Sequence, residues 1–283
     1  MKKKCPKNRP IGVFDSGIGG LTVVKEIRQL LPREDILYFG DTARLPYGTK
    51  SAELIKRYAL EDANFLYERD VKIIVCACHS ASSWALAEIK RAYPIPVIGV
   101  LEAGARAAIK ATKNGKIGVI GTRATIASDA YERALKRINY EHGLNRAIEI
   151  VAKPTPLFVP LVEEGFIDHP ITRAVAREYL KIFPKEGIDT LLLGCTHYPI
   201  LKSVICRILN KGIKVIDASY ETAAMVKDIL QRKDWQKETG RGSLKIYLSD
   251  ITPEFEKIAE QFLEEKPKVI LRASLKEKIT IKE

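Results

Sequence analysis

The sequence lacks the features that would place this chain in or across a membrane. Its 283 residues contain no run of about 18 apolar residues, so we expect no membrane-spanning helix and no membrane partner. The basic residues 2–4 are not followed by an apolar stretch, which argues against a secretory signal. We therefore expect a cytoplasmic protein.

Cysteine is scarce, and its count is odd. The five cysteines are Cys5, Cys76, Cys78, Cys195 and Cys206. An odd count in a long chain without a secretion signal argues against a disulfide framework, and no Cys-x-x-Cys redox motif is present. The thiols should therefore be reduced and serve in packing, metal binding or catalysis.

The motifs of nucleotide binding are incomplete. The glycine-rich segment 15–20 resembles the start of Gly-x-Gly-x-x-Gly, but Thr22 stands where the third glycine belongs, and the lysine of a phosphate loop is missing. A nucleotide site is therefore disfavoured. We expect the backbone N–H groups and Ser16 of this turn to bind a substrate carboxylate instead.

Charge of one sign is in excess, because the formal net charge is +12. Such an excess can mark a nucleic-acid-binding protein. Here the Lys and Arg residues are spread along the whole chain, which is typical of a solvated basic surface. We expect no nucleic-acid partner, although a non-enzymatic basic binding protein stays an alternative.

Short apolar runs alternate with amphipathic segments along the chain. This alternation is typical of parallel sheets covered by helices. The predicted strands are 11–14, 36–39, 73–77, 97–100, 117–120, 147–151, 190–193, 215–216 and 244–248. The predicted helices are 20–31, 51–69, 81–92, 124–138, 170–183, 198–209, 220–231 and 252–264.

The first half of the pattern recurs in the second half. Segment 11–16 resembles 117–122, and segment 73–80 resembles 190–197. We therefore predict an α/β protein of two similar domains, each a mostly parallel sheet flanked by helices. The domains should be related by a pseudo-twofold axis, with the active site in the cleft between them, because ligands bind beyond the carboxyl ends of parallel strands.

Each predicted half carries a cysteine directly after a strand. Cys78 precedes a serine-rich helix start, and Cys195 precedes Pro199, which suits a first helical turn. A thiol at a helix N-terminus loses its proton more easily. Two thiols on opposite walls could transfer protons to and from both faces of one carbon, as a racemase requires.

Two other interpretations of these cysteines stay open. Each could be a small buried hydrophobic residue, which is the interpretation we adopt for Cys76 inside its strand. A zinc site from Cys78, His79, Cys195 and His197 is conceivable. Its spacing fits no compact zinc module, and the metal would occupy both thiolates.

Three further residues could assist the proton transfer. Asp15 and His197 could each orient or deprotonate a neighbouring thiol, and Glu163 could reach the same cleft. Each also has a simpler interpretation: a turn carboxylate, a packing histidine and an acid at a helix end. Residues 46–48 form a predicted tight turn.

Several stretches together resemble the glutamate racemases of the aspartate/glutamate racemase superfamily. The similar stretches are 14–21, 40–42 with 46–48, 121–122 with Thr125, 159–163 and 193–199. The resemblance implies interconversion of L- and D-glutamate for peptidoglycan synthesis without pyridoxal phosphate, metal or another cofactor. It also implies a homodimer, and two domains made of residues 1–102 plus 218–283 and of residues 103–217.

The resemblance further implies a role for individual residues. Cys78 and Cys195 would be the acid/base pair, assisted by Asp15, Glu163 and His197. The residues expected to hold the substrate are Asp15, Ser16, Pro46, Tyr47, Gly48, His79, Ser80, Thr122, Thr125, Thr196 and His197.

The chain departs from the family pattern directly after the first cysteine. The family has Asn-Thr at this point, whereas this chain has His79 and Ser80. Ser80 still offers a hydroxyl, but His79 replaces an amide that contacts the substrate in the family. We therefore keep a racemase acting on aspartate or another amino acid as an alternative.

Overall fold

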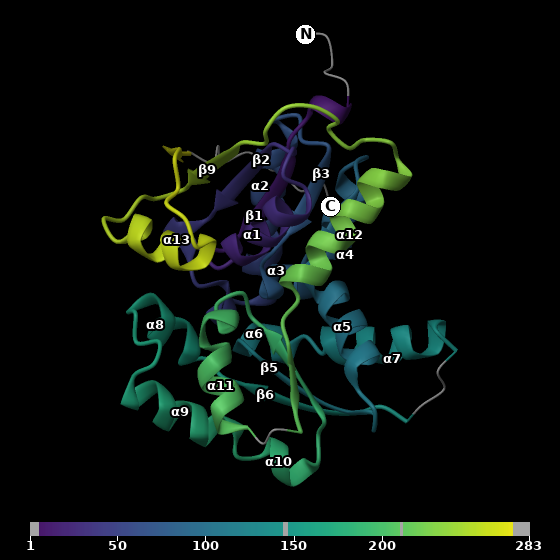
Figure 1. Ribbon diagram of the computed structural model, residues 1–283, viewed down its shortest axis with the longest axis vertical. Coiled ribbons are helices and arrows are strands. Elements are labelled where there is room, and N and C mark those ends of the chain that lie inside the picture. Colours follow the sequence, from purple (N-terminus) through teal and green to yellow (C-terminus); the bar gives the residue numbers. More distant parts are fainter. Residues whose placement is uncertain (1–5, 144–146, 210–211, 274–283) are drawn as a thin grey trace.

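The computed structural model describes residues 6–143, 147–209 and 212–273. Cys5 and the basic residues 2–4 therefore lie outside the described residues. In the described part the strands form two separate parallel sheets, each flanked by helices (Figure 1). The predicted α/β architecture with two sheets is confirmed.

The first sheet combines both ends of the chain. Its strand order is β10-β9-β2-β1-β3-β4, and every neighbouring pair is parallel. Its strands are β1 (Ile11–Asp15), β2 (Ile36–Gly40), β3 (Ile73–Cys76), β4 (Val97–Gly99), β9 (Leu244–Leu248) and β10 (Ile270–Arg272). All residues of β1, β2 and β3 are buried, as expected for central strands covered on both faces.

The second sheet uses only the middle of the chain. Its strand order is β6-β5-β7-β8, again with parallel neighbours. Its strands are β5 (Lys116–Gly121), β6 (Glu149–Pro154), β7 (Thr190–Gly194) and β8 (Lys214–Ile216). This division of strands is compatible with the predicted interleaved domains, whose boundaries at residues 102 and 218 stay a prediction.

The helices cover the faces of these sheets. They are α1 (Leu21–Leu30), α2 (Ala52–Tyr67), α3 (His79–Trp84), α4 (Leu86–Ala92), α5 (Val100–Ala111), α6 (Arg123–Ala127), α7 (Ala130–Glu141), α8 (Phe158–Glu163), α9 (Pro170–Leu180), α10 (Phe183–Glu186), α11 (Lys202–Ile208), α12 (Ser219–Arg232) and α13 (Phe255–Leu263). Short 3-10 turns are η1 (Pro6–Asn8), η2 (Thr42–Arg44), η3 (Tyr47–Thr49) and η4 (Tyr198–Leu201).

The structure corrects several predicted elements. The predicted helix 124–138 is two helices, because Asp129 adopts a left-handed φ of 50° between α6 and α7. The predicted helix 81–92 is likewise divided at Ala85. The prediction missed α5, which starts directly after β4 without a turn, and the three-residue edge strand β10.

In the described part of the chain, no helix is long and apolar enough to cross a membrane.

Candidate active site

Turns from the carboxyl ends of both sheets meet at one place. Asp15 ends β1, and Thr196 follows β7; the Thr196 hydroxyl donates a hydrogen bond to Asp15 Oδ1 at 3.4 Å. A Cβ at position 19 would lie 2.3 Å from Thr196 Oγ1. The glycine-rich turn after β1 can therefore approach the turn after β7 this closely only because residue 19 has no side chain. The structure thus joins two turns that are about 180 residues apart in sequence.

Cys78 lies on the wall formed by the first sheet. It caps the N-terminus of α3, where its Sγ accepts a hydrogen bond from the Ala81 N–H at 3.5 Å and lies 3.5 Å from Ser16 Oγ. Burial raises the pKa of Cys78 to about 12, the Asp15 carboxylate adds to this, and the contacts with Ser16 and Ala81 oppose it. The prediction of an easily ionised Cys78 is therefore wrong for this state, since burial outweighs the helix N-terminus.

Cys195 lies on the wall formed by the second sheet and has a different partner. Its buried Sγ is 4.0 Å from His197 Nδ1, and His197 Nε2 is 3.0 Å from Glu163 Oε1 at the end of α8. Burial alone would lower the pKa of His197, but the hydrogen bonds to Cys195 and Glu163 outweigh it and raise the pKa to about 10. An imidazolium therefore stands between Cys195 and a carboxylate at neutral pH.

Asp15 is fully buried between the two walls. Its Oδ2 accepts a hydrogen bond from the Gly17 N–H at 3.1 Å, and Tyr38 holds the same turn by donating to the Gly17 carbonyl at 3.0 Å. Burial raises the pKa of Asp15, while the charge of His197 and the neighbouring N–H groups oppose the rise. Asp15 is thus placed to interact with both walls.

Three hydroxyls form a triangle on another side of the site. Ser80 Oγ is 2.9 Å from Thr122 Oγ1 and 3.2 Å from Thr125 Oγ1, and the two threonine oxygens are 3.0 Å apart. All three side chains are buried. Thr122 also caps α6, because its Oγ1 accepts a hydrogen bond from the Thr125 N–H at 3.2 Å. The triangle is a compact set of donors that joins the first sheet to the second.

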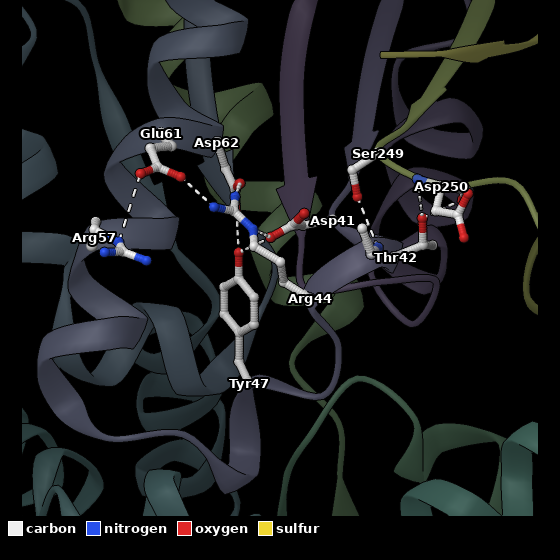
Figure 2. Close-up of polar contacts among 10 residues, drawn as sticks. Asp41, Thr42, Arg44, Tyr47, Arg57, Glu61, Asp62, Ser249 and Asp250 are labelled. Carbon is white, nitrogen blue, oxygen red and sulfur yellow. Dashed lines mark hydrogen bonds and ion pairs between the residues drawn. The ribbon is translucent and has the colours of Figure 1, made fainter. Parts of the chain in front are cut away.

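The turn at residues 46–48 is held by charged residues behind it (Figure 2). Tyr47 Oη lies 2.5 Å from Asp41 Oδ2 and 2.8 Å from Asp62 Oδ2. Arg44 contacts both carboxylates, with Nε 2.6 Å from Asp41 Oδ2 and Nη2 3.2 Å from Asp62 Oδ1. The single hydroxyl proton of Tyr47 can be donated to only one of the two carboxylates. Burial, together with the charge of Asp41, raises the pKa of Asp62 well above its usual range.

In this arrangement the Tyr47 side chain holds the turn at residues 46–48 in place and does not point into the site. The side chain is buried and directed at the carboxylates, while Gly48 approaches Thr122 on the second sheet's side. A Cβ at position 48 would lie 2.4 Å from Thr122 Cβ. That Arg44 and Asp62 hold this turn was not predicted from the sequence. The feature that could have revealed Asp62 is its position as an aspartate on the apolar face of the helix at 51–69.

The same loop is tied to the C-terminal strands. The Ala43 N–H donates to Ser249 Oγ at 2.9 Å, and the Asp250 N–H donates to Thr42 Oγ1 at 2.9 Å (Figure 2). The loop after β2 is therefore fixed from two directions, by α2 and by the end of β9.

The remaining predicted residues are also placed by the structure. His79 is buried and directed at Tyr131, and Pro46 follows a cis peptide bond. Cys76 is buried inside β3, as predicted, and Cys206 is exposed. Within residues 6–143, 147–209 and 212–273, no group of three or more His, Cys, Asp or Glu side chains is arranged to hold a metal ion.

Comparison with known proteins identifies relatives that match most of this chain. Residues 11–226 match the Asp/Glu/hydantoin racemase family. Curated glutamate racemases of Geobacter metallireducens and Aquifex aeolicus are each 48% identical, over 90% and 92% of this chain and 93% and 96% of theirs. The crystal structure of glutamate racemase from Francisella tularensis in complex with D-glutamate has a TM-score of 0.89 and 42% identity, covering 96% of this chain and 100% of that chain.

Proposed function

Since the chain belongs to the Asp/Glu/hydantoin racemase family and is an amino-acid racemase, we propose that it interconverts L- and D-glutamate. One observation carries the proposal: two buried thiols from different sheets face one site, and their environments differ. Cys78 neighbours the carboxylate of Asp15, whereas Cys195 neighbours the imidazolium of His197. The charge of Cys195 is near enough to raise the pKa of Cys78.

The two environments suit the two halves of a proton exchange. For one direction we assign the role of base to Cys195: its thiolate removes the α-proton, so a C–H bond breaks and an S–H bond forms. Cys78 gives its own proton to the opposite face of the carbon, and the negative charge ends on its sulfur. The reverse direction uses the same residues with exchanged roles. Asp15, His197 and Glu163 assist by keeping each sulfur in its required protonation state.

Substrate binding uses the donors and acids around the thiols. The hydroxyls of Ser80, Thr122, Thr125, Thr196 and Ser16 and the backbone at 46–48 would hold the two carboxylates of glutamate. Asp15 is the acid best placed for the ammonium group, because it is buried between both walls. Fixed donors in a buried site stabilise a carbanionic transition state without reorganisation.

The wider role rests on the relatives and the composition. We propose that the D-glutamate produced supplies peptidoglycan synthesis, and that the enzyme acts in the cytoplasm as a homodimer without a nucleic-acid partner.

The proposal is tested by optical rotation. Purified protein is incubated separately with L-glutamate, D-glutamate and the enantiomers of aspartate, and the rotation is followed to its end point. Wild type should bring both glutamate solutions to zero rotation, with aspartate slower. C78S and C195S should each lose at least about 100-fold in rate, whereas C206S should match wild type. Racemisation that survives both serine substitutions would exclude the two-cysteine mechanism, and faster aspartate turnover would reassign the substrate.

A further inference from the structure

A buried histidine–tyrosine pair lies beside the thiols, in the part of the site where the chain departs from its family. His79 follows Cys78 at the start of α3, and Tyr131 belongs to α7 on the second sheet's side. His79 Nδ1 and Tyr131 Oη are 2.6 Å apart. The exposed fractions of both residues are 4%.

The pair spans the two walls of the site. The ring of Tyr131 packs on Gly194, the residue before Cys195, where a Cβ would lie 3.2 Å from Tyr131 Cε2. His79 is the residue after Cys78 on the opposite wall. A change at Tyr131 is therefore transmitted directly to the surroundings of both cysteines.

The imidazole of His79 is neutral. Burial lowers the pKa of His79 to about 3 and outweighs the charge of Asp217, which acts in the opposite direction. A neutral imidazole has one N–H donor and one acceptor nitrogen. Keeping this ring neutral also avoids a cation beside Cys78, which would favour its thiolate.

The surroundings of Tyr131 decide which nitrogen carries the proton. In the described part of the chain, His79 is the one hydrogen-bond partner of Tyr131 Oη, which otherwise packs on Gly104 of α5. A buried hydroxyl proton without an acceptor is costly, so the hydroxyl donates to Nδ1. The proton of the imidazole is then on Nε2, which has no hydrogen-bond partner among the described residues. Nε2 is not one of the fully buried atoms that lack a partner, so it stays open to a further acceptor.

We propose that Tyr131 is a positioning residue that holds His79 as a neutral Nε2–H donor to a carboxylate of the amino-acid substrate. This inference rests on the proposed function, since it concerns the same site. In this role His79 is the hydrogen-bond donor in place of the amide found in the family. Its side chain is longer than that amide side chain, and the hydrogen bond to Tyr131 sets the orientation of its ring.

The test is a double-mutant cycle on the full-length enzyme. Y131F should raise KM for glutamate about tenfold, because one donor is no longer oriented, and should change kcat less. In an H79N background the same Y131F change should alter KM less than twofold, since the amide needs no tautomer. Y140F is the matched control, because Tyr140 is on the same helix and 79% exposed, and it should change neither constant.

A second measurement reads the tautomer without any substitution. The 15N spectrum of labelled wild type should show Nε2 protonated and Nδ1 unprotonated in His79, and Y131F should show a mixture. Protonation at Nδ1, or equal KM effects of Y131F in both backgrounds, would overturn the inference. Wild type that does not racemise glutamate would instead remove the proposed function, and the spectrum would still decide the tautomer.

Discussion

At the scale of single residues, burial and the partners of a buried group together decide its charge. Cys78 and His197 are equally enclosed, with 5% of each residue exposed. Burial keeps the proton on Cys78, and the Asp15 carboxylate adds to this effect. For His197 the contacts with Cys195 and Glu163 outweigh burial and favour the protonated ring. A carboxylate disfavours a second anion and favours a cation, so in both places it favours the protonated form.

The contacts of His197 with Cys195 and Glu163 predict a pH dependence of stability. The pKa of His197 is about 10 in the folded protein and about 6.5 unfolded, so the folded state binds the proton more tightly. The resulting stabilisation is complete below pH 6.5 and is lost as the pH rises through 10. We expect wild type to lose several kcal/mol of unfolding free energy over this range, at about 1.4 kcal/mol per tenfold change in proton affinity.

Urea unfolding at pH 6, 8 and 10 measures this loss. E163Q should start less stable at pH 6 and lose less between pH 6 and 10, because its His197 lacks the ionic partner. E164Q is the matched control, since Glu164 is the next residue and is exposed. Parallel pH curves for wild type and E163Q would refute the assignment.

At the scale of elements, a loop takes its shape from helices and strands behind it. The loop between β2 and α2 carries Gly48 to Thr122, and the carboxylates of Asp41 and Asp62 hold it from behind through Tyr47 (Figure 2). Arg44 compensates the charge of this buried cluster. The loop is therefore a rigid support rather than a free connection.

The close approach at Gly48 predicts an activity defect. In G48A the new Cβ would lie 2.4 Å from Thr122 Cβ, so η3 and α6 must move apart. Because a misplacement of about 1 Å at a catalytic site can cost 100-fold, we expect kcat/KM for glutamate to fall about 10- to 100-fold. The free energy of unfolding should also fall, by about 1–3 kcal/mol, because the overlap forces two buried groups apart.

Steady-state kinetics and urea unfolding on the same preparations separate these effects. G212A is the control, because a Cβ at this exposed position meets no atom within 4 Å. An unchanged kcat/KM in G48A would show that the spacing of these two turns does not matter for turnover.

At the scale of the whole molecule, a buried ion pair joins distant segments. Lys72 Nζ is 2.5 Å from Glu34 Oε2, with 0% and 2% of the two side chains exposed. The same ammonium donates to the carbonyls of Lys7 at 3.2 Å and Trp235 at 2.9 Å. One side chain therefore connects the N-terminal segment, the turn between α1 and β2, and the segment that leads to β9.

Removing this ammonium predicts a large loss of stability. K72M leaves Glu34 buried without its cation, which typically costs about 3–5 kcal/mol. K116M is the matched control, because Lys116 pairs with Glu149 at the surface with 40% and 64% exposure, and such pairs are worth about 0–1 kcal/mol. Thermal and urea unfolding measure both variants, and equal losses would contradict the role of Lys72.

The sequence by itself determined the layers of the molecule and the position of its thiols. Continuous apolar runs specified the strands, and both cysteines follow such a run, so their place at strand ends needed no coordinates. The family motifs identified Glu163 and His197 for the same reason, since a motif is local in sequence. Elements without a strong pattern, such as α5 and β10, were missed.

Only the tertiary structure decided the protonation and partners of these residues. The helix start after Cys78 predicted an acidic thiol, but burial is a property of the whole fold and reverses the direction. The Asp62–Tyr47 and His79–Tyr131 contacts join residues 15 and 52 positions apart. Such contacts depend on how α2, α3 and α7 pack, which no local pattern in the sequence specifies.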